Sequence, residues 1–126
     1  MTVSEWRQGL LSQGAITDAG RGAEHLAGAF HALSDPLRLR VLELLRSREL
    51  CVCELSEQLA VGQSKLSFHL KTLKDAGLVR ARQQKRWTYY SLDLSALVAV
   101  EQYLAEYRRF GPLLPARPCD DLPRGD

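Results

Sequence analysis

Two predicted helices joined by only two residues constrain the fold of this 126-residue chain more than any other feature. Leucines recur every three or four residues over 63–76, which indicates a helix with one buried face. A shorter helix is predicted over 52–60, and Gly77 supplies the residue type that commonly ends a helix. Two helices connected by so short a turn form a helix-turn-helix.

Further elements are predicted on both sides of this unit. A first core helix begins near Ala23, and a second runs over 36–46, where Asp35 is a favourable N-cap and Pro36 suits the first helical position. Aromatic and β-favouring residues after Gly77 predict a β-hairpin over 78–83 and 86–92, followed by a helix over 94–110. The predicted fold class is mainly α with a β-hairpin, a winged helix-turn-helix.

The two ends of the chain differ in composition from its middle. Residues 1–20 have weak periodicity and are predicted to be an N-terminal tail with a short helix near Trp6. Four of the five prolines lie between Pro112 and Pro123, so residues 111–126 are predicted to be an extended C-terminal tail. One folded domain over 21–110 agrees with the length.

The location of the protein is predicted from two negative signals. No run approaches the roughly 20 apolar residues that span a bilayer. The first residues lack the charged and apolar regions of a secretory signal, so we expect a cytoplasmic protein without a membrane partner. Three cysteines in a reducing compartment are then more consistent with ligands or reactive thiols than with disulfides.

Positive charge is concentrated in one segment. Residues 63–90 contain seven Lys and Arg against one acid, whereas the whole chain has a net charge of +2. The remaining residues are therefore net negative. Such asymmetry is typical of a surface that contacts phosphates.

The outward face of the predicted helix over 63–76 suits the major groove of DNA. Ser and Gln reach base edges or phosphates, Lys neutralises phosphates, and Phe68 fits a thymine methyl. An isolated lysine-rich face would be interpreted as merely solvated, but the short helix before it and the basic hairpin after it favour DNA. The hairpin arginines and Lys85 are expected to have no acidic neighbours to satisfy them, which favours phosphate contact across the minor groove.

His69 lies at the edge of the apolar stripe, so a partly buried, hydrogen-bonded histidine is favoured over a base-reading one, although it stays a candidate. The predicted DNA contacts are Gln63, Ser64, Lys65, Ser67, Phe68, His69, Lys71, Arg82, Lys85 and Arg86.

Cys51 and Cys53 stand at the predicted start of the short helix. A single cysteine is usually a small buried apolar residue, but a pair at this position favours ligands. The positive end of a helix favours the thiolate form. If both residues were helical, their side chains would point about 200° apart, so binding one ion would distort the first turn. Such a distortion would shift the helix over 63–76 and act as a switch.

Five motifs in order resemble those of the ArsR/SmtB repressors and cover roughly residues 24–108. They are ALSDPLR (32–38), ELCVCEL (49–55), QSKLSFHLKTL (63–73), AGLV (76–79) and WTYYSL (87–92). The resemblance implies a homodimeric winged helix-turn-helix repressor whose first and last helices pair two chains. It also implies release from double-stranded operator DNA when a metal or metalloid binds.

The ion is suggested by the same resemblance. The segment CVCEL is similar to the arsenic-responsive branch, whose motif Cys-Val-Cys-Asp-Leu-Cys supplies three thiolates to As(III). Ser56 stands at the third position here, which leaves Cys119 as the remaining candidate. The nine residues after Phe110 span about 30 Å when extended, enough to reach the site of the same or the partner subunit. The alternative is a site with two protein sulfurs. The implied inducer is As(III), with Sb(III) also compatible, and no organic cofactor is implied.

The chain departs from the family pattern in two places. Gly62 replaces a capping Ser, which is tolerable because Gly is a fair N-cap. The hairpin tip over 83–86 lacks the usual glycine, which argues against a two-residue turn with positive φ.

Features of other members of the family disfavour several alternatives to the arsenic response. Zinc responders use His and carboxylates on the last helix, where this chain has only Glu101 and Glu106, and cadmium responders use N-terminal cysteines, which residues 1–50 lack. Soft thiolates also favour As(III) over zinc. A thiol redox sensor or a cadmium or zinc responder on the same scaffold remains the alternative. A cysteine-dependent enzyme is remote, because neither thiol has an Arg within the next eight residues.

Overall fold

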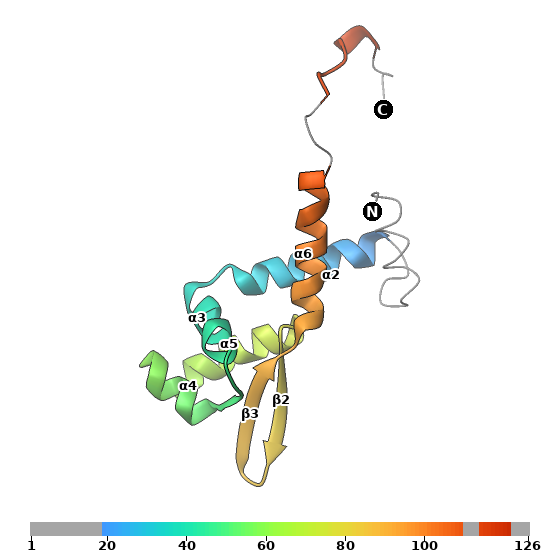
Figure 1. The fold of residues 1–126 in the computed structure, drawn as a ribbon. Coiled ribbons are helices and arrows are strands. Elements are labelled where there is room, and N and C mark those ends of the chain that lie inside the picture. Colours follow the sequence, from blue (N-terminus) through green and yellow to red (C-terminus); the bar gives the residue numbers. More distant parts are fainter. Residues whose placement is uncertain (1–18, 110–113, 122–126) are drawn as a thin grey trace.

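The computed structural model describes residues 19–109 and 114–121, and the predicted helix near Trp6 lies outside them. Five α-helices and a small antiparallel sheet make up these ranges, as Figure 1 shows. The mainly α fold with a β-hairpin is confirmed. In chain order the elements are α2 (Ala19–Leu33), α3 (Pro36–Leu45), β1 (Leu50–Cys51), α4 (Val52–Leu59), α5 (Gln63–Asp75), β2 (Val79–Gln84), β3 (Trp87–Leu92), α6 (Leu94–Arg109) and the 3-10 turn η1 (Cys119–Asp121).

The start of α3 is capped as the sequence predicts. The Asp35 carboxylate accepts hydrogen bonds from the backbone amides of Leu37 at 2.8 Å and Arg38 at 3.2 Å, and Pro36 occupies the first turn. Partial desolvation raises the pKa of Asp35, but these two amides and the nearby His69 and Arg38 outweigh it, so the pKa is lowered overall.

The connection between α4 and α5 is held by its own backbone. Ala60 ends α4 in the left-handed region with φ of 55°, and Gly62 precedes α5 as its N-cap. Ser56 bonds Val61 twice, since its hydroxyl donates to the Val61 carbonyl and its own carbonyl accepts from the Val61 amide. The predicted helix-turn-helix therefore has a closed, hydrogen-bonded turn.

The hydrophobic core lies between α2, α3, α4 and α5 and one side of the sheet. The three leucines of the predicted stripe on α5, Leu66, Leu70 and Leu73, are completely buried, as is Leu55 on α4. At the end of α5, Gly77 has a φ of 77° and the Leu78 amide bonds the Leu73 carbonyl at 2.9 Å. This Schellman arrangement turns the chain directly into β2.

The sheet has three strands in the order β1-β3-β2, all antiparallel. The sequence predicted the hairpin but not β1, because a two-residue strand carries no alternating pattern. Lys85 and Arg86 form the two-residue hairpin turn, and Lys85 has a φ of 56°. The expectation that no such turn forms is wrong, because Lys85 adopts the left-handed conformation without being glycine.

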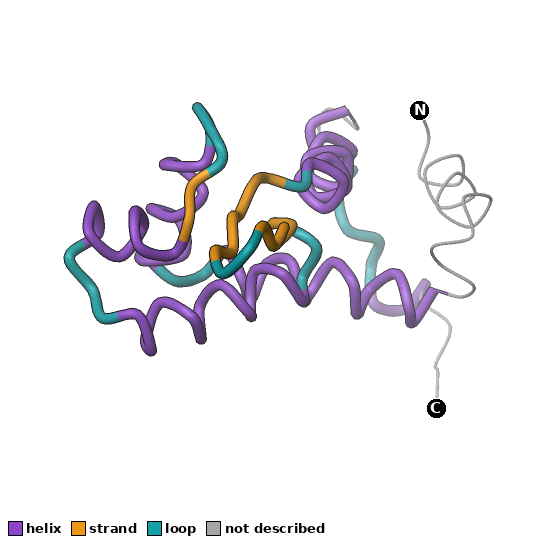
Figure 2. Tube along the Cα trace, turned by 90° about the horizontal axis from the view of Figure 1, so that it is seen from below, coloured by secondary structure: helices purple, strands orange, loops and turns teal. Residues whose placement is uncertain are grey.

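Helix α6 crosses α2 and extends away from the hairpin (Figure 1), and Figure 2 shows it nearly end-on. Large apolar side chains remain exposed on these two helices, including Phe30, Val98, Leu104 and Tyr107. No helix in the described part of the chain combines the length and the apolar character needed to cross a membrane.

Candidate nucleic-acid interface and thiol site

Helix α5 presents the predicted polar face outward. The candidates Gln63, Ser64, Lys65, Ser67, Phe68 and Lys71 are all exposed, and 65% of Phe68 is accessible. Lys71 bonds Asp75 one turn later at 3.1 Å, but both side chains are largely exposed. Such a pair contributes less than about 1 kcal/mol, so Lys71 can exchange it for a phosphate at little cost.

His69 is turned inward, which confirms the expectation of a buried, hydrogen-bonded histidine. Only 8% of the residue is exposed, and its Nδ1 lies 2.9 Å from Nη1 of Arg38. A guanidinium only donates hydrogen bonds, so Nδ1 accepts and the ring proton sits on Nε2. The structure therefore removes His69 from the set of candidate DNA contacts.

Arg38 is a buried residue that the sequence reasoning did not single out. Its Nε donates to the Ala32 carbonyl at 2.7 Å and its Nη2 to the His31 carbonyl at 3.1 Å, both in the last turn of α2. One cation thus joins α2, α3 and α5. The sequence signal was its position one helical turn before Val41, on the buried face of α3.

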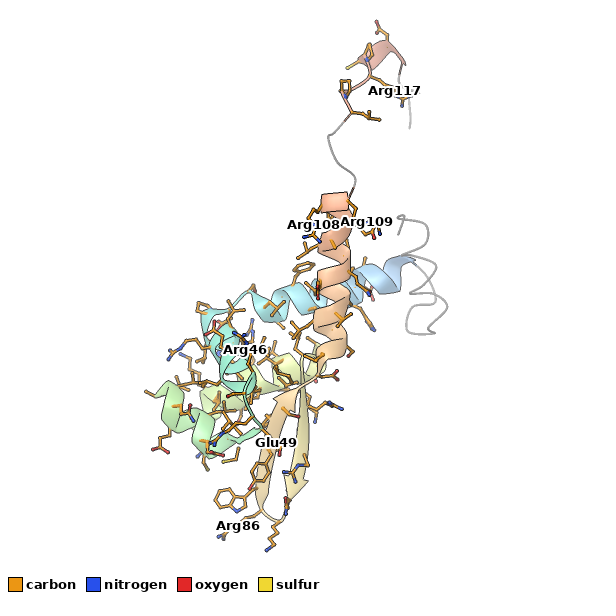
Figure 3. The ribbon with its side chains drawn as sticks, viewed as in Figure 1. Arg46, Glu49, Arg86, Arg108, Arg109 and Arg117 are labelled. Atoms are coloured by element: carbon orange, nitrogen blue, oxygen red, sulfur yellow. The ribbon has the colours of Figure 1, made fainter. Side chains whose placement is uncertain are left out.

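The hairpin carries the predicted basic residues, and one of them forms an ion pair with an acidic side chain. Arg86 lies at the tip (Figure 3), 5.4 Å from the Trp87 ring, and neighbouring Lys85 is exposed. Arg82, in contrast, is bound to Glu49 through two hydrogen bonds of 3.1 Å and 2.6 Å. The expectation that the hairpin arginines lack acidic neighbours is wrong for Arg82, because Glu49 is 33 residues away in sequence and only the fold brings it near.

The two thiols lie in different surroundings. Cys51 belongs to β1 and is the N-cap of α4, with extended φ and ψ of −84° and 165°, and it is buried. Cys53 lies in the first turn of α4 and is exposed. Its Sγ lies 3.7 Å from Nε2 of Gln63 at the start of α5. Only Cys53 is helical, so the case of two helical cysteines does not arise. Cys51 is already extended and is paired with Tyr89 on β3.

The Glu54 side chain binds the backbone at Cys51. Its carboxylate accepts the Cys51 amide at 3.2 Å and bonds Arg48 at 2.7 Å. The hydrogen bonds from Cys51, followed by the charge of Arg48, hold the pKa of Glu54 below its ordinary value of 4.5.

Cys119 is not brought to the other two cysteines in this protomer. It lies exposed in η1, beyond the end of α6 that is remote from α4 (Figure 1). Within residues 19–109 and 114–121, no three His, Cys, Asp or Glu side chains gather closely enough to hold a metal ion. Ser56 stands where the arsenic-responsive motif has its third cysteine, and its hydroxyl donates to the Val61 carbonyl in the α4–α5 turn.

A helix-turn-helix followed by a basic hairpin defines the class of winged helix-turn-helix proteins. The family model described as "Bacterial regulatory protein, arsR family" matches residues 35–81. The arsenical resistance operon repressor of Bacillus subtilis is 46% identical over 51% of this chain and 62% of its own length. The repressor of the same name from Staphylococcus xylosus is 38% identical over 64% of this chain and 78% of its own.

Solved structures agree with these relatives. An ArsR family transcriptional regulator superposes with a TM-score of 0.66 and 32% identity, covering 70% of this chain and 91% of that one. The homodimeric winged helix-turn-helix DNA-binding domain of a possible ArsR-family regulator from Mycobacterium bovis superposes with a TM-score of 0.57 and 30% identity. The match covers 67% of this chain and 81% of that one. The chain belongs to the arsR family of bacterial regulatory proteins, a family of regulators and not of enzymes.

Proposed function

We propose that this protein is a transcriptional repressor that binds operator DNA as a homodimer and leaves it when As(III), or Sb(III), is bound by cysteine thiolates. The observation that carries the proposal is the contact between Cys53 and Gln63, because Gln63 is the first residue of α5. A thiol that takes part in binding an ion at this point is mechanically connected to the helix proposed to read DNA.

The proposed DNA contacts are the exposed face of α5 and the tip of the hairpin. The α5 face contributes hydroxyl, amide and lysine side chains, and Lys85 and Arg86 at the tip contribute positive charge. Phosphate contacts of this kind supply affinity, whereas side chains on the helix in the major groove supply specificity. Arg82 is bound to Glu49 and is not among these proposed contacts.

A homodimer is supported by the exposed apolar face of α2 and α6. Phe30 meets Tyr103 edge-on at 6.0 Å, and Leu104 and Tyr107 extend the same face, each more than half exposed. An apolar surface of this kind marks a protein interface. The homodimeric Mycobacterium bovis relative adds support. Pairing through these helices would place two α5 helices on successive turns of a palindromic operator.

The proposed inducer site consists of Cys51, Cys53 and Cys119 of the same or the partner subunit. Two soft sulfur donors suit As(III) better than zinc, and the described residues gather no histidine or carboxylate set beside them. The arsenical resistance repressors among the relatives support the same choice. For the sulfurs to act together, Cys51 must leave its shielded place beside β3, and this movement would disturb the start of α4 and its contact with Gln63.

The test is an operator-binding titration under reducing conditions with arsenite, antimonite, zinc and cadmium in parallel. We expect release by arsenite. The variants Cys51→Ser and Cys53→Ser should still bind operator but ignore arsenite, because neither thiol is among the proposed DNA contacts. Dissociation by peroxide but not by arsenite would instead establish a redox sensor, and loss of operator binding in both variants would assign the thiols a structural role.

A further inference from the structure

The Glu49–Arg82 ion pair is bidentate. Both carboxylate oxygens of Glu49 accept from the guanidinium, and the remaining Nη1 donates to Gln84 at 2.7 Å. The guanidinium also lies 4.8 Å from the centre of the Tyr89 ring. All three guanidinium nitrogens thus donate a hydrogen bond, which fixes the orientation of the group. The hydrogen bonding lowers the pKa of Glu49 and raises that of Arg82, in agreement with this geometry.

The sheet register connects this pair with the thiol site. Tyr89 on the central strand β3 is the partner of Cys51 on β1 and of Arg82 on β2. Directly opposed residues place their side chains on the same face, so Cys51, Tyr89 and Arg82 form one row across the sheet. Glu49 lies two residues before Cys51 and reaches over this row to Arg82. The segment that carries the buried thiol is therefore fastened to the hairpin.

Strand β1 is the weakest edge of the sheet. It pairs with β3 only through Leu50 and Cys51, whereas β2 and β3 are paired along six residues each. A movement of Cys51 toward Cys53 would therefore displace β1 and the adjoining Glu49 before it displaced β2. A bidentate ion pair is sensitive to such a shift, because both of its hydrogen bonds lengthen together.

We propose that the Glu49–Arg82 pair is the coupling element between the thiol site and the hairpin: ligand binding at Cys51 pulls Glu49 away, releases Arg82 and changes the position of the hairpin on DNA. The inference rests on the function proposed above. It assigns Glu49 and Arg82 as positioning residues that transmit the signal to the hairpin, in parallel with the Cys53–Gln63 contact to α5.

The coupling predicts an effect that is measurable without DNA. In the wild type, arsenite binding must break the ion pair, whereas Glu49→Gln has no such pair to break. Arsenite should therefore bind DNA-free Glu49→Gln about two- to five-fold more tightly, the range expected for one exposed ion pair. Arg82→Gln removes the guanidinium of the same ion pair and should raise the arsenite affinity by the same factor. Ultraviolet absorbance of the arsenic–sulfur bonds reports the binding.

Asp75→Asn is the matched control, because it also removes one acid from an exposed ion pair with a basic residue, Lys71, but not near the thiols. It should leave arsenite affinity unchanged. The ratio of operator dissociation constants with and without arsenite should fall by a similar two- to five-fold factor in Glu49→Gln and not in Asp75→Asn. In the double variant Glu49→Gln/Arg82→Gln this ratio should fall no further than in either single variant.

Two negative results have different meanings. If arsenite releases the wild type, and Glu49→Gln matches both the wild type and Asp75→Asn in arsenite affinity and in release ratio, the coupling role is refuted while the proposed function stands. If arsenite neither binds the wild type nor releases it from operator, the proposed function is refuted and the coupling with it.

Discussion

Replacing Arg38 by Met removes a cation that joins three helices while preserving most of its unbranched stem. The guanidinium bonds the carbonyls of Ala32 and His31 and Nδ1 of His69 at 2.7, 3.1 and 2.9 Å. Ala32 and His69 are both buried, so water cannot replace the lost donor at these two acceptors, whereas exposed His31 can be hydrated. Arg38→Met therefore leaves two buried acceptors without a partner.

The magnitude follows from these two acceptors. A buried polar group without a hydrogen bond costs about 1 to 3 kcal/mol, so the free energy of unfolding should fall by about 2 to 6 kcal/mol. This is a large part of the roughly 5 to 15 kcal/mol that a domain has in total. Urea unfolding at one fixed protein concentration measures the change, since the stability of a dimer depends on concentration.

Arg46→Met is the matched control, because Arg46 is an exposed arginine at the end of the same helix (Figure 3). Its effect should stay within about 0.5 kcal/mol. Arg38→Met combined with His69→Leu should cost less than the sum of the single variants, since the orphaned ring nitrogen disappears. A loss below about 1 kcal/mol for Arg38→Met would refute the reasoning.

Three further predictions concern the thiol tail, the DNA face and acid stability. Cys119→Ser should weaken the arsenite response while operator binding stays intact, and an unchanged arsenite dose response would remove Cys119 from the site. Lys71→Ala and Arg86→Ala should each weaken operator binding and reduce its salt slope by about one, and an unaltered slope would contradict phosphate contact. Hydrogen bonds hold the pKa values of Glu54 and Asp93 below the ordinary 4.5 and 3.8, so their stabilisation is complete above those values and disappears as pH falls through the lower folded values. The urea midpoint should therefore decline between about pH 5 and pH 3, less so in Glu54→Gln.

Local periodicity was enough for most of the fold. The leucine stripe of α5 and the Asp35-Pro36 start of α3 involve residues within one or two turns of each other, and the structure confirms both. The outward direction of Phe68 and Lys71 followed from the same helical geometry. Interactions of this range are visible in a sequence because backbone geometry alone decides which side chains share a face.

What the sequence determined by itself is the helical order, the buried stripe, the exposed basic face and the presence of two neighbouring thiols. Only the tertiary structure decided how these parts are connected. The pairing of Cys51 with Tyr89, the bond of Arg38 to His69 and the ion pair of Arg82 with Glu49 each link residues more than 30 positions apart. No periodic pattern encodes such contacts, because they depend on how helices and strands pack against one another, and packing turned His69 inward and bound Arg82 to an acid.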